Sequence, residues 1–174
     1  LLMAQCAPTI KKLGLELGGN APFIVFDDAD LDAAVAGAMA STCRNNGQTC
    51  VCANRIYVQA GIHDEFVAAL AEQARNTATT FAGGPTDPDA LVPPMNNERQ
   101  MQQVLGFLAR TPEHAQIVAG GVRQGDRGFF IEPTVFADVP NESALAQEEI
   151  FGPVLCVIPY EDDDDAVRIA NDSR

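Results

Sequence analysis

The alternation of short apolar runs with longer helical runs is the feature that most constrains the fold of this chain. The expected strands occupy 13–17, 22–26, 55–59, 116–119, 129–136 and 154–158, and the expected helices occupy 31–43, 62–79, 97–110 and 163–171. Helical segments of this length serve as the crossovers that parallel strands require. The sequence therefore predicts one α/β domain over residues 1–174, in which helices cover both faces of a mostly parallel sheet in three αβα layers.

Two segments carry a more specific expectation. The run at 22–26 is apolar throughout, which is typical of a strand buried on both faces. Residues 83–94 are rich in Gly and Pro, and they predict a long turn-rich connection.

Composition and charge narrow the classes of partner. Of the 174 residues, 47% are hydrophobic, which supports a full core. No apolar run approaches the roughly 20 residues of a membrane span. The formal net charge of −13 argues against nucleic acid and against anionic membrane surfaces. The acidic run Glu161–Asp165 is expected to be the solvated start of a helix, where carboxylates complement the helix dipole.

The cysteines indicate a reducing compartment. Five is an odd count and no CxxC pattern occurs, so we expect free thiols and a cytoplasmic location. Cys6, Cys43 and Cys156 are expected to be small buried hydrophobic residues. His63 and His114 are expected at the surface, and we predict no metal site.

The polar stretch at 44–54 places Cys50 on a short connection between a helix and a strand. Arg44 would add positive potential, and the N–H groups of residues 48–51 would be available to stabilise a thiolate or an oxyanion. The residues alone leave open whether Cys50 is reactive or merely structural.

Glu16 lies in the apolar run at 13–17, beside Gly18 and Gly19. An unpaired carboxylate inside a strand is costly, and burial would raise its pKa toward the value that a general base needs. The alternative is a carboxylate at a strand end that faces water. The residues leave both readings open.

Three blocks resemble the signatures of the aldehyde dehydrogenase superfamily. They are residues 15–22 (LELGGNAP), 47–50 (GQTC) and 148–154 (EEIFGPV), in the family's order. The sequence of residues 23–32 and 48–55 is similar to that of the succinate-semialdehyde dehydrogenase branch. The resemblance spans essentially the whole chain and implies the catalytic domain of such an enzyme.

The resemblance implies a role for five residues. Cys50 would attack an aldehyde carbonyl and carry a thioester after oxidation, and Glu16 would activate the water that hydrolyses it to a carboxylic acid. The main chain of Leu17 would lie against the nicotinamide amide of NADP or NAD. Glu149 would bind the nicotinamide ribose, and Phe151 would pack beside the nicotinamide. The implied partner is a small-molecule aldehyde, and the full-length protein would be a homo-oligomer.

Two further residues carry hypotheses with alternatives. Arg44 matches an arginine of the succinate-semialdehyde branch, and it would bind the distant carboxylate of succinate semialdehyde. If it instead binds a carbonyl at the helix end, the substrate would be an uncharged aldehyde. Cys52 either packs or forms a labile disulfide with Cys50 that blocks the nucleophile reversibly. Cys43 stands where the resemblance leads us to expect an aromatic residue.

The sequence also predicts what the chain lacks. It begins without Met, ends inside a helical pattern, and contains no GxGxxG motif and no upstream oxyanion-hole asparagine. We therefore expect a piece of a larger enzyme, without the main cofactor-binding and oligomerisation parts and inactive by itself. The competing reading from another class is a non-catalytic interaction domain that keeps the fold.

Overall fold

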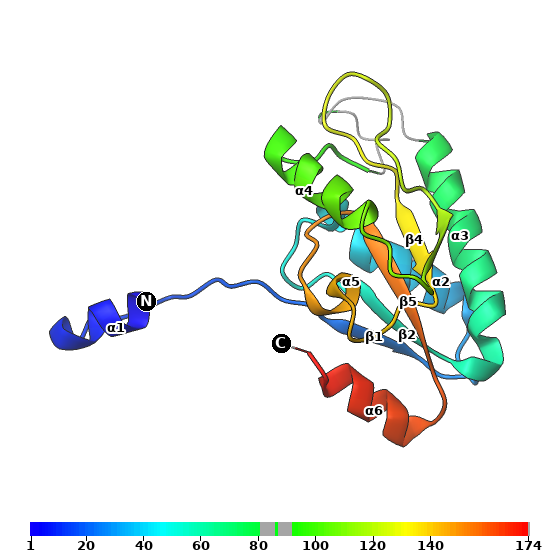
Figure 1. Cartoon of the computed structure of the whole chain (residues 1–174), viewed down its shortest axis with the longest axis horizontal. Coiled ribbons are helices and arrows are strands. Elements are labelled where there is room, and N and C mark those ends of the chain that lie inside the picture. Colours follow the sequence, from blue (N-terminus) through cyan, green and yellow to red (C-terminus); the bar gives the residue numbers. More distant parts are fainter. Residues whose placement is uncertain (81–85, 87–91, 174) are drawn as a thin grey trace.

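A five-stranded sheet forms the centre of the computed structural model, which describes residues 1–80, 86 and 92–173 (Figure 1). The strands are β1 (Pro22–Val25), β2 (Arg55–Gln59), β3 (Gln116–Ala119), β4 (Thr134–Ala137) and β5 (Val154–Tyr160). Their order across the sheet is β1-β2-β5-β4-β3. All neighbouring pairs are parallel except β3 and β4, which are antiparallel. The predicted mostly parallel sheet is confirmed.

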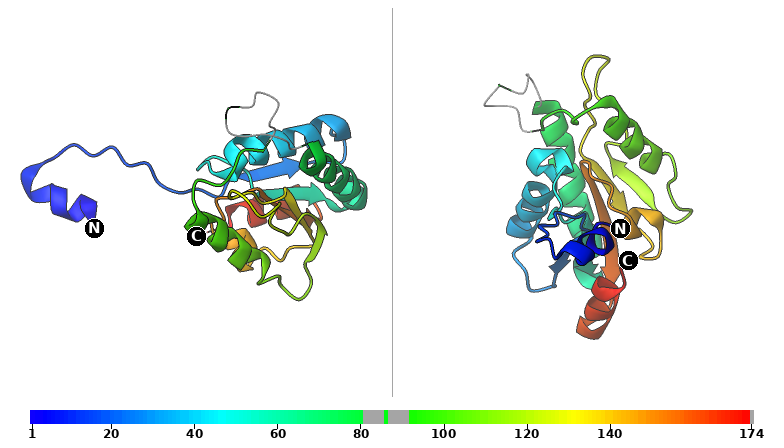
Figure 2. Two further views of the ribbon diagram at one scale, coloured as in Figure 1. Left: turned by 90° about the horizontal axis from the view of Figure 1, so that it is seen from above. Right: turned by 90° about the vertical axis from the view of Figure 1, so that its left-hand side faces the viewer.

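Helices cover both faces of this sheet (Figure 2). On one face lie α2 (Leu31–Cys43) and α3 (His63–Thr80), and on the other lie α4 (Glu98–Leu108), α5 (Ala144–Gln147) and α6 (Asp163–Asn171). Side chains of β2 alternate between two separate cores, because successive strand residues point to opposite faces. Ile56 and Val58 pack with α2 and α3, whereas Tyr57 packs with the other three helices. The three-layer prediction is therefore confirmed.

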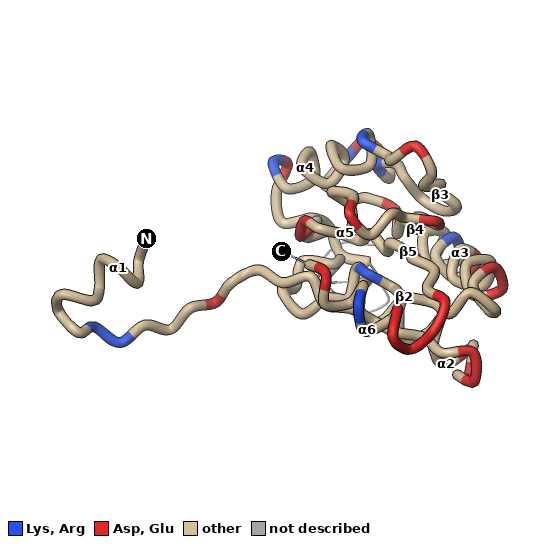
Figure 3. The backbone as a smooth tube through the Cα atoms, turned by 60° about the horizontal axis from the view of Figure 1, so that its bottom comes forward, with Lys and Arg blue, Asp and Glu red and all other residues tan. Residues whose placement is uncertain are grey.

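Carboxylate and amide side chains begin the main helices. The side chains of Asp30, Asn97 and Asp162 accept N–H bonds from the first turns of α2, α4 and α6, which are the bonds that a helix cannot satisfy by itself. The acidic run Glu161–Asp165 lies at the start of α6, as expected (Figure 3). None of the described helices combines the length and apolar character needed to cross a bilayer.

The amino-terminal segment differs from the prediction only at residues 13–17. It contains α1 (Leu2–Cys6) and the short 3₁₀ turn η1 (Ala7–Thr9), and it extends away from the rest of the molecule (Figures 1 and 2). Residues 13–17 form no strand and are exposed, because no neighbouring strand pairs with them there. The strand predicted at 22–26 is shorter and only partly buried, since β1 lies at the edge of the sheet with β2 as its single neighbour.

Three smaller predictions need correction, and one short helix was not predicted. The extended run at 129–136 is a strand only from Thr134, since Pro133 has no N–H to donate to a ladder. The four-residue α5 was not predicted, because so short a helix leaves no periodic pattern. His63 is buried, with its ring nitrogens near carboxylates of Asp64 and Asp138. Cys6 and Cys43 are partly exposed, and Cys156 alone of the three is fully buried. The turn-rich connection at 83–94 lies mostly outside the described residues.

Candidate active site

A left-handed turn shapes the loop that carries Cys50. After α2 the chain passes through the 3₁₀ turn η2 (Arg44–Gly47), in which Asn45, Asn46 and Gly47 have φ values of 50°, 56° and 71°. Asn and Gly are the residues that adopt this conformation at least cost. Gly47 is also required by space, because an added Cβ would overlap the carbonyl of Gly152. The Asn-Asn-Gly sequence thus dictates the local path of the loop.

Hydrogen bonds hold this loop at both ends. Thr42 Oγ1 donates to the carbonyl of Ala53 at 2.9 Å, and the N–H of Ala53 donates to Ser41 Oγ at 3.2 Å. The side chain of Gln48 accepts from the N–H of Asn96 at 2.7 Å. The N–H of Gln48 is bonded to the carbonyl of Asn45, so it is not available for an oxyanion as expected. The N–H of Thr49 donates to the Cys52 thiol, and among the described residues no acceptor is found for the N–H groups of residues 50–51.

The segment that carries Glu16 approaches this loop through two glycines. An added Cβ at Gly19 would overlap the carbonyl oxygen of Cys50, and one at Gly18 would overlap the carboxylate of Glu149. The N–H of Gly19 donates to Glu149 Oε1 at 3.1 Å. Glu16 itself is exposed, so the burial that the sequence suggested for it is not found in this chain. Gly19 is therefore needed for close approach of the two main chains, and Gly18 for close approach of the Glu149 side chain.

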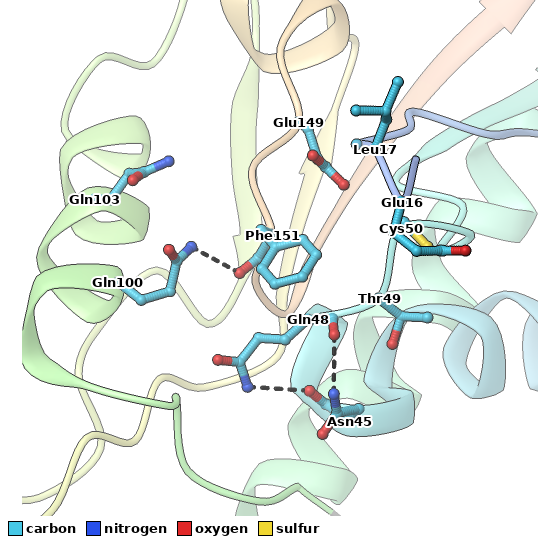
Figure 4. Close-up of a pocket in the computed structure, with 11 residues that line it drawn as sticks. Glu16, Leu17, Asn45, Gln48, Thr49, Cys50, Gln100, Gln103, Glu149 and Phe151 are labelled. Carbon is cyan, nitrogen blue, oxygen red and sulfur yellow. Dashed lines mark hydrogen bonds between the residues drawn. The ribbon is translucent and has the colours of Figure 1, made fainter. Parts of the chain in front are cut away.

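These segments line one cleft of about 620 Å³ (Figure 4). Its described lining consists of Glu16, Leu17, Gly18, Asn45, Gln48, Thr49, Cys50, Gln100, Gln103, Glu149 and Phe151. The structure thus brings together five predicted site residues from three distant parts of the chain. Cys50 is partly exposed at the cleft, and its thiol is free.

Phe151 and its partner Gln100 show how the far wall of the cleft is fixed. Phe151 has a φ of 56°, a conformation that a bulky residue adopts only when its surroundings hold it there. Gln100 Nε2, from α4, donates to the carbonyl of Phe151 at 3.0 Å and to that of Ile150 at 3.3 Å. Sequence reasoning missed Gln100 and Gln103, because polar residues on an amphipathic helix read as solvent-facing.

Arg44 lies outside the Cys50 cleft. It is exposed and lines a neighbouring groove of about 520 Å³ with Cys43, Gln73 and Thr77 among others, and Asn45 contributes to both spaces. No carboxylate pairs with Arg44 in the part of the chain that the structure describes. Burial raises the pKa of Cys52, and the charge of Arg44 is one of the interactions that partly offset this rise.

Cys52 is buried, whereas Cys50, two residues earlier in the same loop, is partly exposed. Burial raises the pKa of its thiol, and the bond with Thr49 and the charge of Arg44 only partly offset that rise. Burial likewise raises the pKa of Cys43 to about 12, with a smaller contribution from Cys52. Both Cys50 and Cys52 are free thiols.

The lining of the cleft offers apolar surface against which a flat ring can pack. It also offers a carboxylate that can accept hydrogen bonds from hydroxyl groups. Leu17 is 70% exposed and Phe151 is half-buried, so both offer apolar surface to the cleft. The Glu149 carboxylate, fixed through Oε1 by Gly19, is an acceptor for hydroxyl groups. Within the described residues, no group of three or more His, Cys, Asp or Glu side chains is placed to hold a metal ion.

Comparison with known proteins decides the family. The chain matches the Aldehyde dehydrogenase family over residues 1–174. It belongs to that family. Among curated relatives in the family, a probable succinate-semialdehyde dehydrogenase [NADP(+)] of Sinorhizobium fredii is 47% identical over 99% of this chain and 35% of its own length. A glutarate-semialdehyde dehydrogenase of Pseudomonas aeruginosa is 44% identical with the same coverage.

Solved structures of the family support the fold. An aldehyde dehydrogenase from Brucella melitensis superposes with a TM-score of 0.89 at 46% identity, and one from Bacillus cereus with 0.92 at 35% identity. Each comparison covers 99% of this chain and 35% of the solved one. The chain therefore spans about a third of the length of its relatives.

Proposed function

We propose that the protein to which this chain belongs oxidises an aldehyde to a carboxylic acid through a thioester on Cys50. The observation that carries the proposal is the single cleft in which Glu16, Cys50 and Glu149 meet, although they are far apart in the sequence. The family supports an aldehyde as substrate class. The chain itself, residues 1–174, is proposed to be the catalytic domain.

Cys50 and its loop would carry the covalent chemistry. The Cys50 thiolate adds to the carbonyl carbon of the aldehyde and forms a C–S bond, while the carbonyl oxygen gains negative charge. N–H groups of residues 50–51 are suited to stabilise that charge, since no acceptor in the described chain occupies them. Oxidation of this adduct leaves a thioester on Cys50.

Glu16 would perform the hydrolysis. Its carboxylate removes a proton from water, whose oxygen adds to the thioester carbon. The C–S bond then breaks, the carboxylic acid leaves, and the electron pair of that bond returns to Cys50 as thiolate. The exposed position of Glu16 at the cleft gives it access to water.

The residues opposite Cys50 would hold NADP or NAD. A bound nicotinamide supplies the two-electron acceptor for the oxidation. Glu149 would accept hydrogen bonds from ribose hydroxyls, Phe151 would pack beside the nicotinamide, and the main chain of Leu17 would meet its amide. The names of relatives and a Bacillus cereus complex with NAD+ support both nucleotides.

For the substrate we propose succinate semialdehyde, with Arg44 binding its distant carboxylate. Several similar relatives are named for anionic aldehydes, namely succinate semialdehyde, glutarate semialdehyde and 3-sulfolactaldehyde. The groove of Arg44 adjoins the Cys50 cleft at Asn45, and its guanidinium has no carboxylate partner in the described chain. An uncharged aldehyde is the second candidate, favoured by the position of Arg44 outside the cleft itself.

The complete protein is further proposed to be a cytoplasmic homo-oligomer. Exposed apolar side chains on the amino-terminal segment, such as Leu1, Met3 and Ile10, support additional packing partners.

The test uses the complete enzyme with a panel of aldehydes and both nucleotides. We expect reduction of NADP or NAD with succinate semialdehyde, loss of turnover in Cys50→Ala, and no turnover by residues 1–174 alone. Arg44→Ala should raise KM for succinate semialdehyde by about 10- to 100-fold, because the variant loses the free energy of a hydrogen bond between charged groups. KM for an uncharged aldehyde should remain nearly unchanged.

Two outcomes would count against these proposals. Equal effects of Arg44→Ala on both aldehydes would favour the uncharged substrate. If no aldehyde is oxidised, and iodoacetamide modifies Cys50 no faster than an ordinary thiol, the non-catalytic reading prevails.

A further inference from the structure

Arg55, the first residue of β2, is a buried cation without a carboxylate partner in the described chain. Its exposed fraction is 2%, and it takes part in none of the ion pairs found among those residues. A buried guanidinium is costly unless its donors are satisfied. The acceptors that satisfy it therefore indicate why it is placed there.

Two of its four hydrogen bonds converge on a single main-chain oxygen. Arg55 Nε and Nη2 donate to the carbonyl of Asn20 at 2.9 and 2.6 Å. Nη1 donates to Tyr57 Oη at 2.9 Å and to the carbonyl of Ala170 at 3.4 Å. Ala170 lies in the last turn of α6, whose carbonyl end carries partial negative charge and helps to balance the cation.

Asn20 is the point at which the Glu16 segment attaches to the domain. Residues 11–18 are exposed, and β1 begins only at Pro22. Between them, the side chain of Asn20 donates to the carbonyl of Ala146 at 2.6 Å, and Gly19 donates to Glu149. Arg55 adds two bonds at the same residue, so the segment is fixed four positions after Glu16.

The same arginine is five positions after Cys50 and begins the strand that follows the Cys50 loop. It therefore joins the strand that follows the nucleophile to the segment that carries the general base. We propose that Arg55 is a positioning residue, which fixes Glu16 relative to Cys50 for hydrolysis of the thioester. This inference rests on the proposed function of Cys50 and Glu16.

The proposal predicts a specific kinetic signature in the complete enzyme. Lys can keep the charge at position 55 but is a point donor, which cannot reproduce the two-bond contact with Asn20. A Glu16 that is displaced by about 1 Å slows hydrolysis by about 10- to 100-fold, whereas attack by Cys50 does not need Glu16. Arg55→Lys should therefore lower kcat and KM together and leave kcat/KM within about twofold of wild type.

Rapid mixing provides the direct readout. Arg55→Lys should show a burst of about one reduced nicotinamide per Cys50, followed by slow turnover. The matched control is Tyr57→Phe, which removes a hydrogen bond from Arg55 in the same buried cluster but leaves both bonds to Asn20 in place. Tyr57→Phe should lower the thermal midpoint without a fall in kcat and without a larger burst.

Arg55→Met is the second variant, in case Arg55→Lys does not fold. It removes the buried charge together with both bonds to the main-chain carbonyl of Asn20, and should lower kcat and KM together in the same way. The proposal is overturned if folded Arg55→Lys keeps the wild-type kcat, or if kcat/KM falls and no burst appears. With Arg55→Lys unfolded, an unchanged kcat in folded Arg55→Met overturns it. A wild-type enzyme without aldehyde-dependent nucleotide reduction would instead defeat the proposed function.

Discussion

Replacing Gly19 by Ala tests the geometry of the site most directly. An added Cβ would lie about 1 Å inside the ordinary contact distance of 3.4 Å from the carbonyl oxygen of Cys50. That oxygen belongs to the main chain, so no side-chain rotation can relieve the overlap. The two segments must separate by about 1 Å, and Glu16 moves with Gly19 because only two residues divide them.

The magnitude follows from that displacement. A misplacement of about 1 Å between reacting groups costs on the order of 100-fold in rate, or about 2.7 kcal/mol of barrier. Overpacking of this kind also lowers the free energy of unfolding by about 1–3 kcal/mol. We therefore expect Gly19→Ala in the complete enzyme to fold with a lower thermal midpoint and to lose about 100-fold in kcat.

Two matched glycine variants make the assay decisive. Gly106 lies inside α4 with no atom within 4 Å of an added Cβ, so Gly106→Ala should raise stability by about 0.5–1 kcal/mol and leave kcat unchanged. Gly18→Ala meets the flexible Glu149 carboxylate instead of main chain, and should mainly raise KM for the nucleotide. The reasoning is refuted if Gly19→Ala keeps a kcat within about twofold of wild type at an unchanged thermal midpoint.

Two further predictions concern the walls of the cleft. Gln100→Ala removes the bonds that hold Phe151 at positive φ, so KM for the nucleotide should rise by about fivefold, which corresponds to the loss of about one hydrogen bond. Gln103 lines the same cleft but makes no such bond to Phe151, so Gln103→Ala should change KM less. Equal effects of the two variants would contradict the role of Gln100. Peroxide oxidises the Cys50 thiolate to a sulfenic acid, and the Cys52 thiol then displaces water to form a disulfide that a thiol reductant reopens. In Cys52→Ser no neighbouring thiol traps the Cys50 sulfenic acid, and excess peroxide oxidises it further to a sulfinic acid that thiol reductants do not reverse. After prolonged treatment with excess peroxide we therefore expect reductant to restore wild type and Cys43→Ser but not Cys52→Ser, as measured by activity. Equal recovery of Cys52→Ser and wild type would exclude the Cys50–Cys52 bridge.

Local patterns in the sequence predicted much of the fold. The periodicity of residues 31–43 and the apolar run at 55–59 correspond to α2 and β2, and Asp30 and Asn97 are the residues that begin their helices. Each of these depends on neighbours within a few positions. The strand expected at 13–17 was wrong for the opposite reason, since a strand exists only where another strand pairs with it.

The sequence by itself determined the left-handed turn at Asn45–Gly47, the layered α/β architecture and the blocks that resemble the family, because each depends on residue type and short spacing. Only the tertiary structure decided which distant groups meet. The sheet order β1-β2-β5-β4-β3 brings Gly19 beside both Cys50 and Glu149, and it turns Arg55 toward Asn20. It also separates Arg44 from the Cys50 cleft. Such contacts depend on long-range packing, which no local pattern specifies.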